Sequence, residues 1–223
     1  MPAAVIEPDA VRSARAARLR GLYAVTPDLD DTTLLLAKVE AAIAGGAAAI
    51  QYRHKDATAH KQAEQAQALA DLCRSRGTLF IVNDDAALAS TVAADGVHLG
   101  RGDGDIAGAR AIVGRHALIG VSCYDNLERA RALAPQADYL AFGSLFASSV
   151  KPAARRAPLA ILRQARALGL PVVGIGGIDA RNAGQAIAAG ADALAVINAV
   201  FASEDVETAA RRIATACASA RGA

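Results

Sequence analysis

An amide and two cations alternate along the chain directly after a short apolar run. Gln51, Arg53 and Lys55 would share one face of a strand, while Tyr52 and His54 would share the other. Two cations on one face repel each other unless an anion lies between them, and that arrangement suits a phosphate or diphosphate. A solvated loop is the alternative reading of this hexapeptide taken alone.

Two aspartates follow later apolar runs at comparable positions. Asp84 comes after the run that ends at Asn83, and Asp103 comes shortly after the run that ends at Leu99. Carboxylates at the ends of neighbouring strands can converge on one Mg²⁺, a hard cation that bridges to substrate phosphate. The alternative is that Asp84 or Asp85 caps the following helix. We expect both roles, with Asp84 on the metal and Asp85 as the cap.

Other residues that could act as nucleophiles or ligands lack the necessary partners in the sequence. Ser122 and Cys123 end an apolar run but do not lie in a G-x-S-x-G pattern. We interpret Ser122 as a hydrogen-bonding residue and Cys123 as buried. His98 lies inside an apolar run, where an interior histidine with satisfied hydrogen bonds is more common than a ligand.

A second candidate anion site lies in the last third of the chain. A hydroxyl-bearing loop includes Ser148, Ser149 and Lys151, and Gly176-Gly177 ends a later apolar run. Glycines there let a phosphate approach backbone N–H groups. With cations and a metal on one side and a glycine nest on the other, the pattern suits the joining of two phosphorylated small molecules with a diphosphate leaving group.

The elements that must position these residues repeat along the chain. Short runs rich in β-branched and aromatic residues alternate with longer helical segments, which predicts a single (β/α)8 TIM barrel with its active site at the C-terminal ends of the strands. We expect a short N-terminal helical extension at residues 1–20 and the catalytic barrel at residues 21–223. An open doubly wound sheet is the alternative. The predicted strands are Gly21–Thr26, Ala49–Arg53, Leu79–Asn83, Gly96–Leu99, Leu118–Ser122, Tyr139–Gly143, Pro171–Ile175 and Leu194–Ile197. Four glycines are predicted to cap helix C-termini: Gly45, Gly77, Gly169 and Gly190.

Composition excludes several classes of protein. The 223 residues are 53% hydrophobic and carry a net charge of +2, which excludes bulk disorder and gives no nucleic-acid footprint. No apolar run is long enough to span a bilayer, so no membrane partner is expected. Three scattered cysteines fit a reducing compartment, and no secretory signal is present, so we expect a cytoplasmic protein. The oligomeric state is left open, a homo-oligomer included.

Taken together, these motifs resemble the thiamine-phosphate synthase (thiamine phosphate pyrophosphorylase) family from about Gly21 to Phe201. The family's Q-x-R-x-K, its N-D pair and its later metal-binding aspartate, post-strand serine, loop lysine and I-G-G-I glycine are all present. In the order of the chain they are Gln51, Arg53, Lys55, Asn83, Asp84, Asp103, Ser122, Lys151 and Gly177.

The resemblance implies a transferase that condenses hydroxymethylpyrimidine diphosphate with thiazole phosphate, often carboxylated, and releases pyrophosphate. It implies Mg²⁺ on Asp84 and Asp103 and a dissociative reaction through a pyrimidine-stabilised carbocation. The catalytic side chains would be Arg53, Lys55, Ser122 and Lys151. The substrate-binding residues would be Gln51, Asn83, Ser148, Ser149, Val150, Gly177, Ile197 and Asn198.

Three residues depart from the family pattern. Val150 replaces the second hydroxyl of T-x-T, Asn198 replaces the serine after the eighth strand, and Arg101 stands where glutamine is common. Val150 and Asn198 both lie on the thiazole-phosphate side. Two alternatives therefore stand beside the synthase: a thiazole tautomerase of the same superfamily, and a non-catalytic paralogue that binds thiazole phosphate or thiamine phosphate as a sensor.

Overall fold

The strands form a closed barrel. The computed structural model describes residues 9–102, 105–147 and 156–222. Within them all strands are parallel, each pairs with its neighbour in sequence, and β8 returns to pair with β1. The strands are β1 (Gly21–Val25), β2 (Ala47–Tyr52), β3 (Leu79–Asn83), β4 (Gly96–Leu99), β5 (Leu118–Tyr124), β6 (Tyr139–Phe142), β7 (Val172–Ile175) and β8 (Ala193–Val196).

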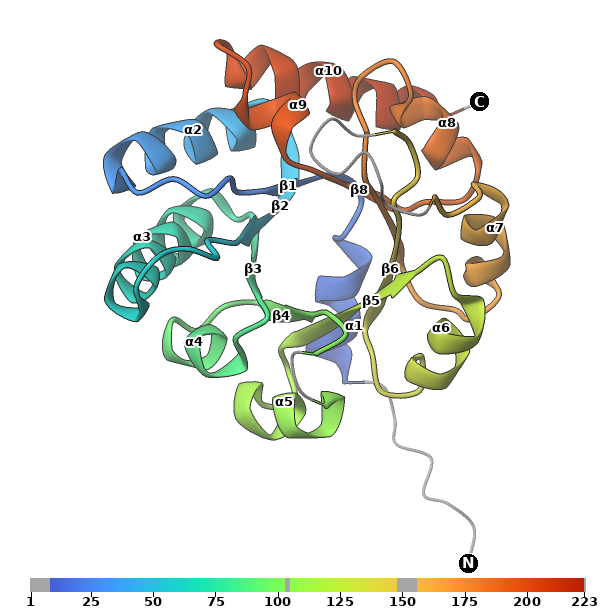
Figure 1. The fold of residues 1–223 in the computed structure, drawn as a ribbon, viewed down its shortest axis with the longest axis horizontal. Coiled ribbons are helices and arrows are strands. Elements are labelled where there is room, and N and C mark those ends of the chain that lie inside the picture. The colour runs from blue at the N-terminus through green and yellow to red at the C-terminus, as the bar shows by residue number, and fades with distance from the viewer. Residues whose placement is uncertain (1–8, 103–104, 148–155, 223) are drawn as a thin grey trace, which may run out of the picture.

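Helices surround this barrel and follow the strands in the order that the sequence predicts (Figure 1). They are α1 (Ala10–Ala17), α2 (Thr32–Ala44), α3 (Ala59–Arg76), α4 (Ala86–Thr91), α5 (Ile106–Val113), α6 (Leu127–Leu133), α7 (Ala160–Arg166), α8 (Ala183–Ala188), α9 (Asn198–Phe201) and α10 (Val206–Ser219). The (β/α)8 prediction is therefore confirmed, and the open sheet is wrong. The division of the chain at residue 20 into two parts stays a prediction.

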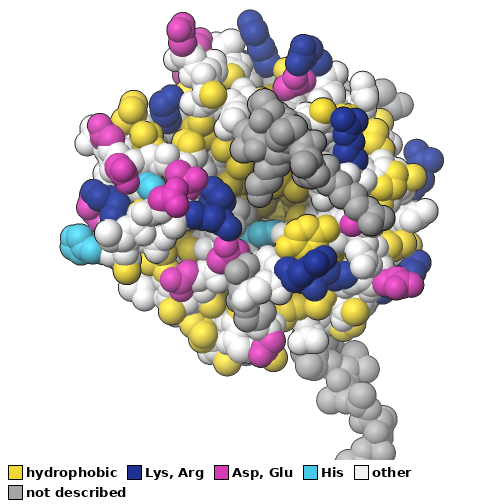
Figure 2. Space-filling view, viewed as in Figure 1, with side chains coloured by type: hydrophobic (Ala, Val, Ile, Leu, Met, Phe, Trp, Pro, Cys, Tyr) yellow, Lys and Arg dark blue, Asp and Glu magenta, His cyan; other side chains and the backbone are white. Residues whose placement is uncertain are grey.

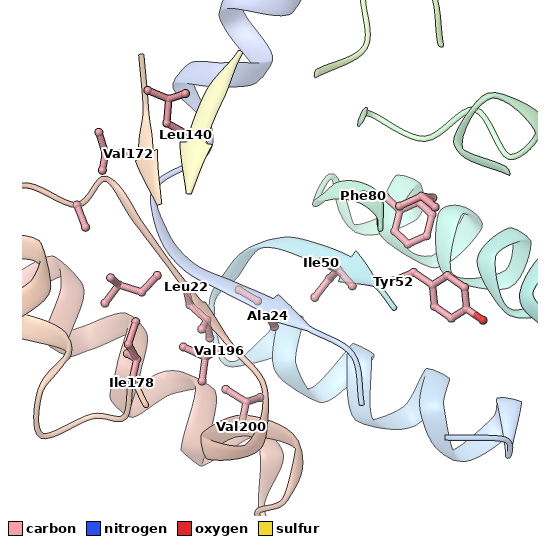
Figure 3. Close-up of a cluster of buried hydrophobic side chains, with 14 of the residues drawn as sticks. Leu22, Ala24, Ile50, Tyr52, Phe80, Leu140, Val172, Ile178, Val196 and Val200 are labelled. Carbon is pink, nitrogen blue, oxygen red and sulfur yellow. The ribbon is translucent and has the colours of Figure 1, made fainter. Parts of the chain in front are cut away.

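The strand side chains alternate between two apolar layers. Outward residues such as Leu22, Ile50 and Val196 pack in the layer between strands and helices, and Figure 3 shows Tyr52 and Phe80 directed toward α3. Inward residues form a separate cluster that fills the barrel: Tyr23, Val25, Ala49, Leu79, Ile81, Leu118, Tyr139, Ala141, Val173, Ala193 and Ala195. The interior is thus a packed core rather than a channel.

Helix α1 closes the N-terminal end of the barrel, and Figure 1 shows it across the barrel opening. Leu19, just after the helix, is completely buried and belongs to the interior cluster. The Arg12 Nε lies 2.9 Å from a carboxylate oxygen of Asp138, and the Arg15 Nε lies 3.1 Å from one of Asp95. Both aspartates lie in loops that precede strands, at the N-terminal end of the barrel. The active site is therefore expected at the opposite, C-terminal end.

The helix ends correct part of the sequence prediction. Gly77 caps α3 in the left-handed conformation, with φ of 65°, and Gly45 caps α2 with right-handed φ. Gly169 and Gly190 also have positive φ, but the caps of α7 and α8 are Ala167 and Ala189. Gly190 nevertheless closes α8 from the position after its cap, because its N–H donates to the Ile187 carbonyl and the Ala191 N–H donates to the Ala186 carbonyl. The prediction is wrong for Gly169, because α7 ends at Arg166 and the glycine lies in the turn that follows.

Candidate active site

The side chains at the end of β2 point alternately into the barrel and toward the helices, as alternation along a strand predicts. The Gln51 side chain is buried and donates from Nε2 to the Tyr23 hydroxyl at 2.7 Å, inside the barrel. The Tyr52 hydroxyl instead donates to Gln65 Oε1 on α3 at 2.9 Å. Arg53 and Lys55 lie beyond the end of β2 and line a pocket at the C-terminal rim of the barrel.

An aspartate that was not predicted from the sequence binds the Arg53 side chain and the backbone of Lys55. The Asp28 carboxylate accepts from Arg53 Nη1 at 3.0 Å and from the Lys55 backbone N–H at 2.9 Å. Burial by itself would raise the pKa of Asp28, but the Lys55 N–H and the Arg53 charge outweigh it and lower that pKa. The Arg53 backbone also exchanges two hydrogen bonds with the Thr26 hydroxyl, so the loop after β1 anchors the cationic loop after β2.

Asp28 could have been found from the sequence. Pro27-Asp28 directly follows the first predicted strand, so the rule that selected Asp84 at a strand end selects Asp28 as well. The expectation that the cations need a bound anion also changes, because the protein supplies carboxylates of its own. Figure 2 shows basic and acidic side chains next to each other at the rim of the central hollow.

A pocket of about 260 Å³ lies where β2 and β3 end, with Arg53, Lys55, Asn83 and Asp84 in its lining. Lys55 Nζ is 4.0 Å from Asp84 Oδ2. Asp84 has φ of 65°, and its backbone N–H donates to the His98 carbonyl at 2.8 Å. Asp85 caps α4 by accepting from the Leu88 N–H at 2.8 Å, which confirms the expected cap.

The second expected metal ligand, Asp103, lies outside the described residues. Within the part of the chain that the structure describes, no group of three His, Cys, Asp or Glu side chains converges on one point. The shared Mg²⁺ site of Asp84 and Asp103 therefore stays a prediction.

Beneath this rim, the barrel interior contains a layer of hydrogen-bonded polar side chains. His98 is buried, as expected, and each of its ring nitrogens has a hydroxyl at 3.0 Å: Tyr139 Oη beside Nδ1 and Ser122 Oγ beside Nε2. Tyr139 in turn lies 3.0 Å from the Tyr23 hydroxyl. Ser122 was predicted as a site residue from the sequence, whereas the two tyrosines were not.

Cys123 is completely buried, as predicted. Burial raises the pKa of its thiol to about 12, so the thiol stays protonated and is a poor nucleophile. This environment agrees with the interpretation of Cys123 as a buried residue with no catalytic role.

The glycine pair after β7 approaches the loop after β6 closely. Gly177 has φ of 66°, and a Cβ on it would lie 2.3 Å from the Ala147 carbonyl oxygen. Asn182 Nδ2 donates to the Gly177 carbonyl at 2.9 Å and fixes that turn. Ile197 precedes α9 and Asn198 is its first residue, exposed at the same rim. Ser148, Ser149, Val150 and Lys151 lie outside the described residues.

These features define a (β/α)8 barrel with cations and carboxylates on one side of its mouth and a glycine turn on the other. Comparison with known proteins narrows this class. A family model described as thiamine monophosphate synthase matches residues 22–200. The chain belongs to the thiamine monophosphate synthase family.

Individual relatives agree over most of the chain. A thiamine-phosphate synthase of Chromobacterium violaceum is 56% identical over 198 residues, which is 88% of this chain and 96% of the relative. That of Methylobacillus flagellatus is 53% identical over 195 residues, 87% of this chain and 93% of the relative. The solved thiamine phosphate pyrophosphorylase of Pyrococcus furiosus has a TM-score of 0.82 at 35% identity and covers 93% of this chain and 98% of its own.

The comparisons do not favour the tautomerase or the sensor, because the relatives cited above are named as synthases or pyrophosphorylases. Among the residues described, no helix has the length and hydropathy of a membrane span.

Proposed function

We propose that this chain is a thiamine-phosphate synthase, a transferase that joins hydroxymethylpyrimidine diphosphate to thiazole phosphate and releases pyrophosphate. The observation that carries the proposal is the pocket between β2 and β3, where Arg53 and Lys55 lie with Asp84 in a chain 56% identical to a synthase. Small phosphorylated molecules are the partners that this mouth suits.

The cationic side of the mouth binds the diphosphate. Arg53 and Lys55 take up its negative charge, and Asp28 holds the Arg53 guanidinium and the Lys55 backbone in place beforehand. Such preorganisation matters because a charge that is already oriented need not reorganise when the leaving group develops its own charge. Gln51, Asn83 and Ser122 orient the same substrate by hydrogen bonds.

The Asp84 carboxylate fits the proposed metal. It lines the pocket beside Lys55 and offers the hard oxygen ligand that Mg²⁺ prefers. Asp84 and Asp103 would hold the ion, which when bound neutralises charge on the pyrophosphate oxygens. Lys151 would add a further positive charge from the loop after β6.

The reaction needs a good leaving group more than a protein nucleophile. The bond from the pyrimidine methylene carbon to the diphosphate oxygen breaks, and its electron pair leaves with pyrophosphate. The thiazole nitrogen then gives its lone pair to the methylene carbon, forming the new carbon–nitrogen bond. The protonated thiol of Cys123 takes no part, which is consistent with a dissociative substitution through a pyrimidine-stabilised cation.

The opposite side of the mouth binds thiazole phosphate. Gly177, Ile197 and Asn198 would contact it, together with Ser148, Ser149 and Val150 of the loop after β6. The turn requires glycine at position 177, because a Cβ there would lie 2.3 Å from the Ala147 carbonyl oxygen.

One assay tests the proposal. Purified protein is mixed with Mg²⁺, hydroxymethylpyrimidine diphosphate and thiazole phosphate, and thiamine phosphate is measured after oxidation to fluorescent thiochrome. We expect product that disappears with EDTA and returns with added Mg²⁺. A folded protein that binds either substrate and forms no product would refute the synthase. Thiamine phosphate that still forms in EDTA would refute only the requirement for Mg²⁺.

The three cysteines support a cytoplasmic location for the enzyme. Cys73, Cys123 and Cys217 are all buried and unpaired, as expected in a reducing compartment.

A further inference from the structure

Five side chains from five different strands form a continuous line of hydrogen bonds across the barrel. Gln51 Nε2 lies 2.7 Å from the Tyr23 hydroxyl, which lies 3.0 Å from the Tyr139 hydroxyl. Tyr139 Oη lies 3.0 Å from His98 Nδ1, and His98 Nε2 lies 3.0 Å from Ser122 Oγ. The two ends of this line, Gln51 and Ser122, are both residues that the proposed function places on the diphosphate substrate.

The donor in each hydrogen bond of this line follows from the donor in the bond before it. Gln51 Nε2 donates to Tyr23, so the single hydrogen of the Tyr23 hydroxyl goes to Tyr139. Tyr139 then has its own hydrogen left to donate to His98 Nδ1. A buried hydroxyl hydrogen without an acceptor is costly, so each bond fixes the next.

The last bonds in the line decide what Ser122 can do. A neutral imidazole that accepts at Nδ1 carries its hydrogen on Nε2 and donates it to Ser122 Oγ. The Ser122 hydroxyl hydrogen is then left to point into the mouth, toward an anionic oxygen. If the Gln51 amide were turned over, every bond would reverse, and Ser122 would donate to His98 instead of to the substrate.

Both phenols keep the hydrogen that this line requires. Burial raises the pKa of Tyr23 and of Tyr139 well above the ordinary value for tyrosine, because the anionic form would lose its hydration. Each therefore stays neutral at physiological pH and can pass a hydrogen bond along.

The Tyr139 ring packs against a glycine on the neighbouring strand. Tyr139 on β6 pairs with Gly120 on β5, and a Cβ on Gly120 would lie 1.8 Å from the ring carbon Cζ. The ring stacks on His98 with centroids 5.6 Å apart and meets Tyr23 edge-on at 6.2 Å. Because Gly120 has no side chain, the Tyr139 ring can pack against it. This packing places the Tyr139 hydroxyl beside His98 Nδ1.

We propose that Tyr139 is a positioning residue for the synthase reaction: it holds His98 as the neutral Nε2–H tautomer, so that Ser122 presents its hydroxyl hydrogen to the diphosphate. Tyr23, oriented by Gln51, supplies the hydrogen bond that makes Tyr139 a donor. This inference rests on the proposed function for its consequence, but the tautomer of His98 is a property of the free protein.

Tyr139→Phe tests the proposal, and Tyr52→Phe is its matched control. Both variants remove the hydroxyl of a buried tyrosine that makes a hydrogen bond of about the same length, but the Tyr52 hydroxyl bonds to α3 outside the barrel interior. The His98 tautomer is read by nitrogen NMR of protein labelled in its 4 histidines, which His98→Gln assigns. We expect Nε2–H in the wild type and in Tyr52→Phe, and a mixture of tautomers in Tyr139→Phe.

We expect kcat to fall when His98 loses the Nε2–H tautomer. We expect Tyr139→Phe to lower kcat about 10-fold, the effect of losing one oriented hydrogen bond, while Tyr52→Phe stays within about twofold. Tyr23→Phe is the second variant, in case Tyr139→Phe does not fold. Without the Tyr23 hydroxyl, Tyr139 can either donate to His98 Nδ1 or accept from it, so we expect a mixture of tautomers and a lower kcat in this variant as well.

Three results would overturn the proposal: Nδ1–H or an imidazolium at His98 in the wild type, a tautomer unchanged by Tyr139→Phe, or equal kcat in Tyr139→Phe and Tyr52→Phe. A wild type that forms no thiamine phosphate would refute the proposed function instead. The NMR measurement on the free protein would still decide the tautomer, so the two failures are distinguishable.

Discussion

Replacing Asp84 by asparagine is the sharpest test of the proposed metal site. The change removes one negative charge and keeps the size of the side chain. Asparagine also tolerates the left-handed φ of 65° at this position better than alanine does, so backbone strain does not confuse the result. The backbone N–H bond to the His98 carbonyl is retained.

The size of the effect follows from the exposure of the site. The Asp84 side chain is 32% exposed, so the dielectric of water is the appropriate limit. A carboxylate roughly 3 Å from a dication then contributes about 3 kcal/mol, or roughly 100-fold in Mg²⁺ affinity. The ion pair with Lys55 is exposed and worth less than about 1 kcal/mol, so its loss cannot produce such a shift.

The assay is a Mg²⁺ titration of the thiochrome rate, with Asp85→Asn as control. Asp85 is the adjacent carboxylate, its role is to cap α4, and asparagine caps a helix equally well. We expect the half-saturating Mg²⁺ concentration to rise roughly 100-fold in Asp84→Asn and less than about twofold in Asp85→Asn. An unchanged titration in Asp84→Asn, or an equal shift in both variants, would refute the metal assignment.

Three further predictions concern the loop after β6 and the closed end of the barrel. Lys151→Ala should lower kcat more than it weakens thiazole phosphate binding; steady-state kinetics showing the reverse would move Lys151 to the other substrate. Val150→Thr should lower the KM for thiazole phosphate by restoring a hydroxyl, and an unchanged or higher KM would mean that the loop has adapted to valine. Asp138→Asn should destabilise the protein by about 3 kcal/mol in urea unfolding, because its carboxylate is only 8% exposed and neutralises two arginines. Asp71→Asn, an exposed pair partner, should cost less than about 0.5 kcal/mol, and equal losses in the two variants would contradict this reasoning.

Local patterns predicted the elements and many of the side-chain directions. All eight predicted strands are present, and β3 and β4 have the predicted bounds. Gln51 lies inside the barrel and Tyr52 outside it because alternation along a strand depends only on the strand itself. Asp85 was predictable as a cap for the same reason, since it contacts a backbone N–H three residues away.

Prediction from the sequence is weaker where an effect depends on how an element ends or on which strand lies beside it. Gly169 follows its helix but does not cap it, because α7 ends at Arg166, before the glycine is reached. Asp28 was overlooked although it follows a strand, because its importance comes from Arg53, which is 25 residues away in the chain.

By itself, then, the sequence determined the barrel, the order of its strands, the face of each strand residue and the resemblance that names the chemistry. Only the tertiary structure decided that Tyr23 and Tyr139, 116 residues apart, share a hydrogen bond with no site motif to mark them. The physical reason is that alternation fixes which side chains point inward, whereas closure of the barrel fixes which of them meet. Gly120 illustrates the difference: its place in a strand follows from the sequence, but the need for glycine follows only from the ring packed against it.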